Sequence, residues 1–313
     1  MFTIRHSQIV GVFFYVSMYN ICAMKDTTPY IDFIVPYVNN KDDIWRNNYI
    51  EYCKKHNLNQ KIIEMLGARY GGITFIYDQL KLVNKNMPWI NKIYLLLSNK
   101  EQIIPSLLPP NCEIVLHEQF IPQKYLPTFN STTIEMFLWR IPNLSEYFIY
   151  ANDDMLPIGK LEPSDFFDKG KIRINWEKRK FSPCSNVFSY QCMNNIKALF
   201  KELERKVDDS IIIKPLHSFT PMIKSHCAEC WGLLKKYIEP HIRAFRTEYQ
   251  YNQYIYPLYE RYALSGTIDS DIDFLYTELD KDFDLNHQII CVNGEIKKEY
   301  INKYKLEIKK LCE

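Results

Sequence analysis

Short apolar runs that end in polar residues recur along the first half of the chain. They lie at residues 30–38, 92–97, 113–116 and 147–151. Runs of this length, rich in aliphatic and aromatic side chains, are typical of buried strands. Segments suited to helices lie between them: one follows the polar turn 39–43 and extends to about Asn57, one spans 73–86 and one spans 131–140. Strands that alternate with helices predict an α/β fold with a mostly parallel, Rossmann-like sheet.

Polar residues follow three of these predicted strands, at 39–43, 98–99 and 152–154, and His117 follows the remaining one. The carboxyl ends of parallel strands meet at one edge of a sheet, where ligands bind in open α/β folds. Asp153 and Asp154 are adjacent carboxylates that repel each other, so a divalent metal that holds a phosphate is a natural partner for them. A simple turn is the alternative interpretation, because Asn and Asp favour turns.

The alternation of strands and helices weakens after Phe167. Residues 168–215 are polar and irregular apart from a helix expected at 198–206, and we interpret them as an insertion or a helical lid. The elements expected beyond are helices at 230–239 and 248–263, a strand at 289–293 and a lysine-rich helix at 295–313. We therefore predict a helical C-terminal portion and three parts of the chain: an N-terminal segment (1–29), a main domain (30–293) and a basic C-terminal helix (294–313).

The N-terminal segment contains an apolar stretch from Ile9 to Met24. A signal peptide or a short anchor would have such a stretch. However, it is shorter than the roughly 20 residues of a spanning helix and includes Tyr15, Tyr19 and Asn20. We therefore expect a cytoplasmic chain. The C-terminal lysines favour a solvated helix face, with peripheral contact with the inner face of the membrane as the minority interpretation.

Composition excludes several classes of protein. The 39 Lys and Arg against 37 Asp and Glu give a net charge of +2, which is not the signature of a nucleic-acid-binding protein. Glycine is scarce, with 9 residues, and no Gly-rich phosphate-loop motif is present. The 9 cysteines are odd in number and irregularly spaced, which favours reduced thiols. Cys227 and Cys230 could be half of a zinc site, but ordinary buried thiols are the favoured interpretation.

Three further residues suit chemistry on a phosphate ester. His217 stands between two prolines and could act as a general base or donate to a phosphate, because the ordinary pKa of histidine lies near neutrality. A loop histidine bonded to backbone is the plainer alternative. Arg246 and Arg69 could fork onto phosphate oxygens, although each alone is more often part of a surface salt bridge. Together with the paired aspartates, they predict a phosphate-binding edge.

The stretch 127–167 resembles the Stealth family of sugar-phosphate transferases, which includes bacterial capsular-polysaccharide phosphotransferases and the catalytic subunit of the lysosomal-enzyme N-acetylglucosamine-phosphotransferase. Its matching motifs are Asn130-Ser131, Ile134-Glu135, Arg140-Ile141-Pro142, Asn152-Asp153-Asp154 and Asp165-Phe166-Phe167. Further blocks match in order at 31–45, 69–94, 217–246 and 291–293, of which the last two are weaker. The sequence departs from the family pattern at 71–74, where an acidic pair is usual, and at Gly294, where an Asp is usual.

The resemblance implies a glycosyltransferase-A-like sheet and the transfer of a sugar-1-phosphate from a nucleotide sugar, expected to be UDP-linked, to a hydroxyl of a glycan acceptor. Attack occurs at the β-phosphorus, and the nucleoside monophosphate leaves. By the same resemblance, Asp153 and Asp154 hold Mg²⁺ or Mn²⁺, His217 acts as base or phosphate ligand, and Arg246 neutralises developing charge. The remaining residues implied are Glu135, which orients the metal shell or the acceptor, and Arg69, Asp42, Asn130 and Asn152, which bind substrate.

Two other functions stay open at this stage. A conventional metal-dependent glycosyltransferase would use the same aspartate pair but would form a glycoside and release the nucleoside diphosphate. A non-catalytic relative could bind glycans through some of the 23 tyrosines and would turn over no nucleotide sugar. The sequence leaves the donor sugar, the acceptor and the oligomeric state open.

Overall fold

The computed structural model describes residues 29–59, 64, 75–180, 186–208, 211–278, 284–293 and 298–313. The fold below is that of the compact unit Ile31–Glu313. Three features singled out in the sequence lie outside the described residues, namely the apolar stretch before Lys25, Arg69 with the glycines after it, and Gly294.

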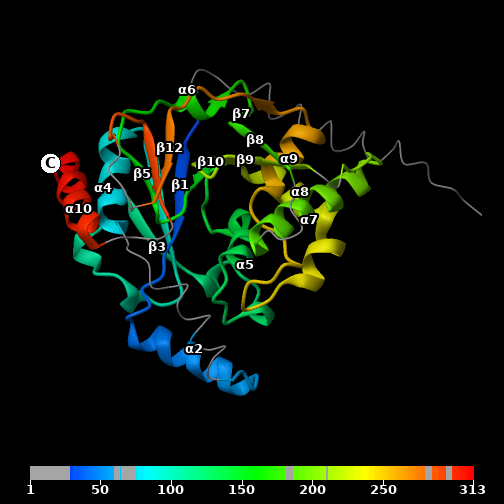
Figure 1. The fold of residues 1–313 in the computed structure, drawn as a ribbon, viewed down its shortest axis with the longest axis horizontal. Helices are drawn as coiled ribbons and strands as arrows, with labels where there is room; N and C mark the ends of the chain where they lie inside the picture. Colours follow the sequence, from blue (N-terminus) through cyan, green and yellow to red (C-terminus); the bar gives the residue numbers. More distant parts are fainter. Residues whose placement is uncertain are drawn as a thin grey trace, which may run out of the picture. The chain divides into compact units, whose positions relative to one another are not determined.

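A five-stranded sheet in the order β10-β4-β1-β2-β3 forms the centre of the fold (Figure 1). Strands β1 (Ile31–Pro36), β2 (Ile90–Leu97), β3 (Cys112–Leu116) and β4 (Tyr147–Tyr150) run parallel. Strand β10 (Thr220–Ile223) pairs antiparallel with β4 at the edge. The predicted mostly parallel α/β fold is confirmed. Strand β10 was missed, because its four residues follow a proline-rich loop and carry no alternation of their own.

Both faces of this sheet are buried, which explains why its strands read as continuous apolar runs. In β1, Phe33 and Val35 pack with helix α4 (Ile76–Asn86), while Ile34 packs with the opposite cluster. That cluster contains helices α7 (Val187–Glu202), α8 (Lys224–Ile238) and α9 (Ile255–Tyr262). Figure 1 shows α4 on one flank of the sheet and α7 to α9 on the other.

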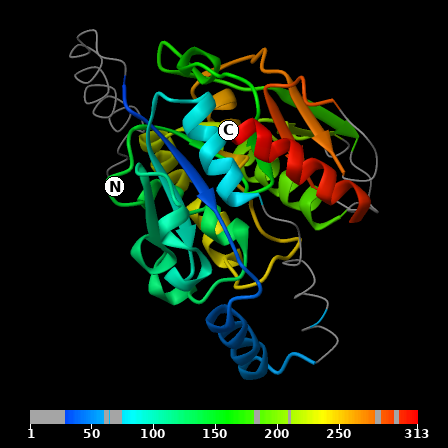
Figure 2. The ribbon, with the colours of Figure 1, turned by 90° about the vertical axis from the view of Figure 1, so that its left-hand side faces the viewer.

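A second sheet brings a late part of the chain beside the acidic loop after β4. Its order is β12-β13-β5, formed by β12 (Phe274–Thr277), β13 (Ile289–Val292) and β5 (Met155–Pro157). β13 runs antiparallel to β5 and pairs Cys291 with Met155. Helix α10 (Lys298–Cys312) lies beside α4 (Figure 2) and buries Tyr304 and Ile308 against this layer. The expected strand at 289–293 and the expected C-terminal helix are confirmed.

The segment 168–215, predicted to be irregular, contains regular structure. Strands β8 (Trp176–Lys180) and β9 (Ile211–Pro215) form an antiparallel pair on either side of α7. Helix α7 is far longer than the predicted helix at 198–206. Its first turn is capped by Asn186, whose side chain accepts a hydrogen bond from the Ser189 amide at 3.1 Å. The pairing of β8 with β9 is non-local, so periodicity within either strand could not reveal it.

Three predicted helix boundaries were also wrong. The helix expected at 131–140 is α5 (Ser131–Glu135) followed by a 3₁₀ turn, because the Phe137 amide bonds to the Ile134 carbonyl three residues back. The helix expected at 248–263 begins at Ile255, since the Asn252 side chain bonds the Tyr254 amide and competes with a helical turn. The helix expected at 230–239 begins earlier, at Lys224.

The shorter elements complete the unit. Helix α2 (Asp43–Lys55) follows the turn after β1, and α6 (Pro163–Phe166) follows β5. Strands β11 (Thr267–Ile268), β7 (Lys171–Arg173) and β6 (Phe167–Asp168) form a small sheet. The 3₁₀ turns are η1 (Lys100–Gln102), η2 (Pro105–Leu107), η3 (His117–Gln119), η4 (Gln123–Tyr125), η5 (Leu138–Arg140) and η6 (Glu239–His241). None of the helices described here is long and apolar enough to cross a membrane.

Candidate active site

A cavity of about 820 Å³ opens at the carboxyl edge of the central sheet. Most of the side chains that the sequence singled out line it, namely Asn130, Glu135, Asn152, Asp153, Asp154, His217 and Arg246. Asp42 is not among the lining residues. The strand ends meet here because β1, β2 and β4 are parallel, and β10, being antiparallel, brings the loop that precedes it to the same edge.

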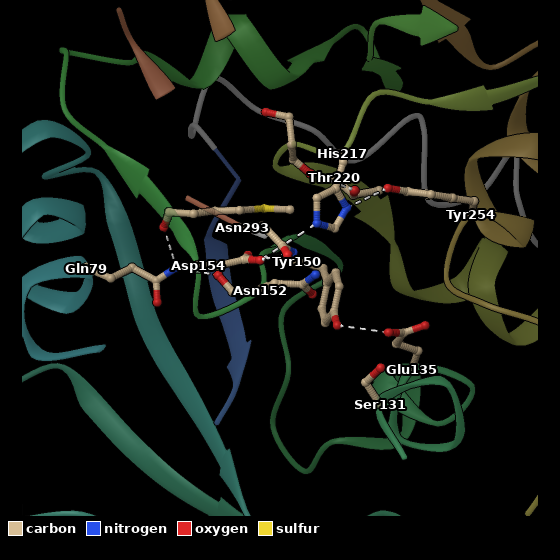
Figure 3. A network of polar contacts seen from close by, with 12 residues as sticks. Gln79, Ser131, Glu135, Tyr150, Asn152, Asp154, His217, Thr220, Tyr254 and Asn293 are labelled. Carbon is tan, nitrogen blue, oxygen red and sulfur yellow. Dashed lines mark hydrogen bonds and ion pairs between the residues drawn. The ribbon is translucent and has the colours of Figure 1, made fainter. Parts of the chain in front are cut away.

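Asp154 has its two carboxylate oxygens in different surroundings (Figure 3). Oδ2 accepts a hydrogen bond from the Asn293 side-chain amide at 2.6 Å and lies 3.9 Å from His217 Nε2. Oδ1 is buried and has no partner among the described residues. The Asp154 carbonyl accepts from the Val292 amide at 2.8 Å, so strand β13 fixes the backbone of the acidic loop. One oxygen is therefore held in place while the other is left available to a ligand.

Gln79 of α4 holds the acidic loop from the other side (Figure 3). Its Nε2 donates to the Asn152 carbonyl at 2.7 Å and to the Met155 carbonyl at 2.6 Å. These two carbonyls flank the aspartate pair, and Gln79 is fully buried. Sequence reasoning missed this residue, because a glutamine on an amphipathic helix carries no signal for a contact with a loop so far along the chain.

Asp153 shows the like-charge effect that the sequence predicted. Burial and the neighbouring Asp154 carboxylate raise the pKa of Asp153 to about 7. A positive partner, such as a bound cation, would lower it again. The aspartate pair would thus attract a cation most strongly when both groups are ionised.

His217 lies in the loop between β9 and β10 and points its ring into the cavity (Figure 3). Its Nδ1 is 3.0 Å from the Tyr254 hydroxyl. Burial raises the pKa of Tyr254 well above its ordinary value, so the phenol keeps its proton. The ring is thus held by a side chain, and its Nε2 faces Asp154. The partner Tyr254 was not singled out by the sequence, where it is one of several tyrosines around α9.

Glu135 and Arg246 form the opposite wall of the cavity. Glu135 is buried; its oxygens accept from the Gln253 amide at 3.0 Å and the Tyr150 hydroxyl at 3.3 Å. Arg246 is exposed and donates to the Ser131 hydroxyl, one turn before Glu135. Burial raises the pKa of Glu135, and the Arg246 guanidinium opposes that rise. The positively charged guanidinium of Arg246 is therefore held next to the buried carboxylate of Glu135.

Asn130 and Asp42, which the resemblance assigns to substrate binding, have internal hydrogen-bond partners. Asn130 caps α5 and its Nδ2 donates to the Arg243 carbonyl at 3.2 Å, which ties the loop that carries Arg246 to α5. Asp42 caps α2 by accepting from the Trp45 amide at 2.7 Å, and it also accepts from Asn99 at 2.9 Å. Both residues position cavity walls, and only Asn130 also lines the cavity.

Comparison with known proteins identifies the central region. Residues 69–174 match the family model described as Stealth protein CR2, conserved region 2. The chain therefore carries the second conserved region of the Stealth family. The resemblance drawn from the sequence is confirmed.

The chain is similar to several curated proteins named capsular polysaccharide phosphotransferase. It is 28% identical over 219 residues to the one from Actinobacillus suis, which covers 66% of this chain and 57% of the relative. It is 31% identical to fcs1 of Haemophilus influenzae, over 69% of this chain and 60% of the relative. It is also 31% identical to WcwK of Streptococcus pneumoniae, over 68% of this chain and 64% of the relative. The chain spans about three fifths of the length of these relatives.

The crystal structure of the galactosyltransferase LgtC in complex with donor and acceptor sugar analogues aligns with 90% of this chain and 95% of its own. The sequence identity is 10% and the TM-score 0.37. That similarity is too low to bear on fold or function.

The Stealth region supplies only part of the cavity. Glu135 and the aspartate pair lie within it, whereas His217, Arg246 and Asn293 come from beyond its end at residue 174. The antiparallel strands β10 and β13 place His217 and Asn293 against the Stealth region. The site is therefore assembled from the conserved region and the C-terminal half of the chain.

A metal fits beside Asp154. The ligand atoms of Asp154, His217 and Cys291 lie within 4.8 Å of one another, whereas Asp153 is not part of this group. Burial and the Asp154 charge raise the pKa of Cys291 well above its ordinary value, so its thiol stays protonated and is a poor ligand. Mg²⁺ and Mn²⁺ prefer oxygen ligands, and the unpartnered Oδ1 of Asp154 offers one. The donor set thus fits a hard cation held chiefly by carboxylate.

The alternative zinc site at Cys227 and Cys230 gains no support. Both cysteines lie on α8 within the apolar cluster against the sheet. Burial raises the pKa of each thiol well above its ordinary value. The potential metal-ligand group found in the described part of the chain includes neither residue. They are ordinary buried thiols.

Proposed function

We propose that the chain transfers a sugar-1-phosphate from a UDP-linked sugar to a hydroxyl of a glycan acceptor. The nucleoside monophosphate leaves, and a phosphodiester forms during synthesis of capsular or surface polysaccharide. The observation that carries the proposal is the Asp154 carboxylate, with one oxygen unpartnered and the other 3.9 Å from His217 Nε2, inside the large cavity. The printed names of the relatives, capsular polysaccharide phosphotransferases, support the class of reaction.

The proton of the acceptor hydroxyl goes to His217 in this mechanism. The acceptor oxygen forms a bond to the β-phosphorus, the bond from that phosphorus to the bridging oxygen breaks, and its electron pair leaves with the nucleoside monophosphate. His217 Nε2 can accept the proton when Nδ1–H donates to the Tyr254 hydroxyl, which lies 3.0 Å away. Tyr254 therefore orients the ring.

Charge that develops on the phosphoryl oxygens is neutralised by groups already in place. Arg246 lines the cavity and is held by Ser131 beside the Glu135 carboxylate. A guanidinium fixed in this way can fork onto two phosphoryl oxygens. A divalent cation held by Asp153 and Asp154 would supply further neutralisation of the pyrophosphate. Glu135 acts through Arg246 and through the backbone at Gln253, which makes it a positioning residue in this proposal.

Product analysis tests the proposal directly. The purified chain is incubated with a panel of nucleotide sugars, Mg²⁺ or Mn²⁺ and glycan acceptors, and the products are followed by phosphorus NMR. A phosphodiester resonance with release of UMP is the expected result. Release of UDP with a glycoside would establish the conventional glycosyltransferase instead. An absence of turnover with every donor in the presence of metal would contradict both reactions.

A further inference from the structure

Four side chains at one end of the cavity carry buried polar atoms with no hydrogen-bond partner in the described part of the chain. The atoms are Ser98 Oγ, Gln102 Nε2 and Oε1, His117 Nε2 and Thr128 Oγ1, and all four residues line the cavity. Buried donors and acceptors are almost always paired, and the exceptions concentrate where a ligand supplies the partner. Gln102 is the clearest case, because it is 2% exposed and both of its polar atoms are unpaired.

The central sheet places these residues together. β2 and β3 are parallel, and Leu97 pairs with Leu116, so Ser98 and His117 follow neighbouring strands at the same edge. Gln102 ends the 3₁₀ turn η1 just after β2. Thr128 lies in the segment that leads into α5. Ser98, Gln102 and His117 thus come from segments that the sheet holds side by side, and Thr128 lines the same cavity from the segment before α5.

The described residues that line this end of the cavity include no acidic or basic side chain that is charged at neutral pH. The lining residues that follow β1, β2 and β3 include no Asp, Glu, Lys or Arg among the residues described. Burial lowers the pKa of His117 to about 4, so its ring is neutral at physiological pH. Phosphate recognition uses cations or backbone amides, and among the described lining residues no cation lies at this end. The chemistry here suits a neutral group that both donates and accepts hydrogen bonds.

Apolar and aromatic surface lies next to the unpaired atoms. Pro36 ends β1, the neighbour of β2, Tyr37 and Val38 follow it, and all three line the same cavity. A planar ring with apolar faces and a polar edge matches this combination. β4, which carries Asp154 at its end, lies two strand positions from β2 and three from β3, or about 10–14 Å at the usual strand spacing. An extended nucleoside diphosphate reaches over such a distance.

We propose that Ser98, Gln102, His117 and Thr128 form the subsite for the nucleobase of the donor. The inference rests on the proposed function, which places the pyrophosphate near Asp154. Uracil fits because it presents two carbonyl oxygens on either side of one N–H. The Gln102 carboxamide can accept from that N–H and donate to one carbonyl, and the hydroxyls of Ser98 and Thr128 can donate to uracil oxygens.

The test replaces Gln102 with methionine, which keeps the length of the side chain and removes both unpaired atoms. Dissociation constants are measured by calorimetry for UDP, CDP, ADP, GDP and inorganic pyrophosphate in the presence of Mg²⁺. We expect Gln102→Met to weaken UDP binding at least tenfold, to remove the preference for UDP, and to leave pyrophosphate binding unchanged. The exposed Gln123→Met is the matched control and should bind every ligand as the wild type does.

Stability provides a second, independent readout. If a ligand is the missing partner, Gln102→Met removes two unpaired buried atoms and should keep or raise the melting temperature of the ligand-free protein. Thr128→Val, which is isosteric, should behave in the same way and should also weaken UDP binding. If Gln102 has only a structural role, Gln102→Met should lower the melting temperature and weaken the binding of UDP and of pyrophosphate together. That result would overturn the subsite.

The outcomes separate this inference from the proposed function. Transfer of sugar phosphate combined with unchanged UDP preference in Gln102→Met would overturn the subsite and leave the function standing. A different outcome is possible: the wild type prefers UDP but forms no phosphodiester, and Gln102→Met loses the preference for UDP. That outcome would support the subsite and contradict the function. A wild type that binds no nucleotide more tightly than pyrophosphate would overturn the subsite as well.

Discussion

Individual side chains in the cavity combine charge and burial in ways that a purely structural role does not require. Asp154 keeps a buried carboxylate oxygen unpartnered beside a second aspartate. Each of these features lowers the stability of the ligand-free chain. Features of this kind are characteristic of binding and catalytic sites, where a ligand completes the arrangement.

Asp154→Asn changes a single atom and tests whether the Asp154 carboxylate serves a ligand. The substitution keeps the shape and the Asn293 contact but removes the charge that a cation needs. We expect phosphodiester formation to fall by about 10²–10³, the usual effect of losing one charge stabiliser. The melting temperature should stay the same or rise, because repulsion with Asp153 is relieved. The exposed Asp271→Asn serves as control; a folded Asp154→Asn protein with near-wild-type turnover would contradict the assignment.

His117 predicts a pH dependence of stability. Burial lowers its pKa in the folded chain to about 4, below the ordinary value of 6.5. The unfolded chain therefore takes up a proton that the folded chain refuses, and stability is lost as the pH falls from about 6.5 to about 4. The loss is on the order of 3 kcal/mol at most. Denaturant unfolding between pH 4 and 8 should show a smaller slope for His117→Phe than for the wild type; equal slopes would contradict the prediction.

Among the elements, strands from beyond the Stealth region and helix α4 within it hold the acidic loop in position. β13 bonds to the Asp154 backbone, β10 presents His217, and α4 holds both ends of the acidic loop through Gln79. The loop after β4 is thus constrained from three directions. This rigidity is what a site needs in order to place a cation and a base at fixed positions.

Gln79→Met tests the contribution of α4. The change removes two hydrogen bonds to buried carbonyls, so we expect a loss of about 1–3 kcal/mol in the free energy of unfolding. The acidic loop should also lose its fixed position, lowering kcat more than it raises the KM for the donor. Lys81→Ala, on the exposed face of the same helix, should change neither quantity. A variant that loses stability but keeps its kcat would show that the clamp is structural only.

At the scale of the whole described unit, α10 completes a layer of the core. Tyr304 and Ile308 are almost fully buried against Leu82, Leu156 and Ile290. Lys303, Lys305, Lys309 and Lys310 are exposed on the other face of this amphipathic helix, which agrees with a solvated surface. The C-terminal helix is therefore part of the fold that supports β5 and β13, and through them the acidic loop.

Ile308→Ala and Leu306→Ala form a matched pair on this helix. Ile308 is fully buried, whereas Leu306 is 57% exposed. We expect Ile308→Ala to lower the free energy of unfolding by about 2–5 kcal/mol through the lost contacts and the cavity left behind. Leu306→Ala should change it by less than about 0.5 kcal/mol. Similar losses in urea denaturation for both variants would show that α10 does not pack as described.

The apolar and polar pattern of the chain was enough to predict the central sheet. Buried strands of a parallel sheet read as apolar runs because both of their faces are covered, so residues 30–38, 92–97, 113–116 and 147–151 were recognisable, as was the edge where they end. The aspartate pair stood out because its position after a buried strand implies a ligand-binding edge. The motifs within residues 127–167 were specific enough to indicate the Stealth resemblance, and the family comparison confirmed that resemblance.

How the remaining residues meet this edge depends on long-range packing, which the pattern along the chain does not contain. Strands β5, β10 and β12 are short and pair with strands that are distant in the sequence, so the local periodicity of apolar residues did not predict them. The contacts of Gln79 with the acidic loop, of Tyr254 with His217 and of Asn293 with Asp154 likewise join residues far apart in the chain. Gln102 shows the same limit, because a missing hydrogen-bond partner is a property of the packed fold. The sequence places residues on elements, but packing alone determines which side chains are satisfied and which are left for a ligand.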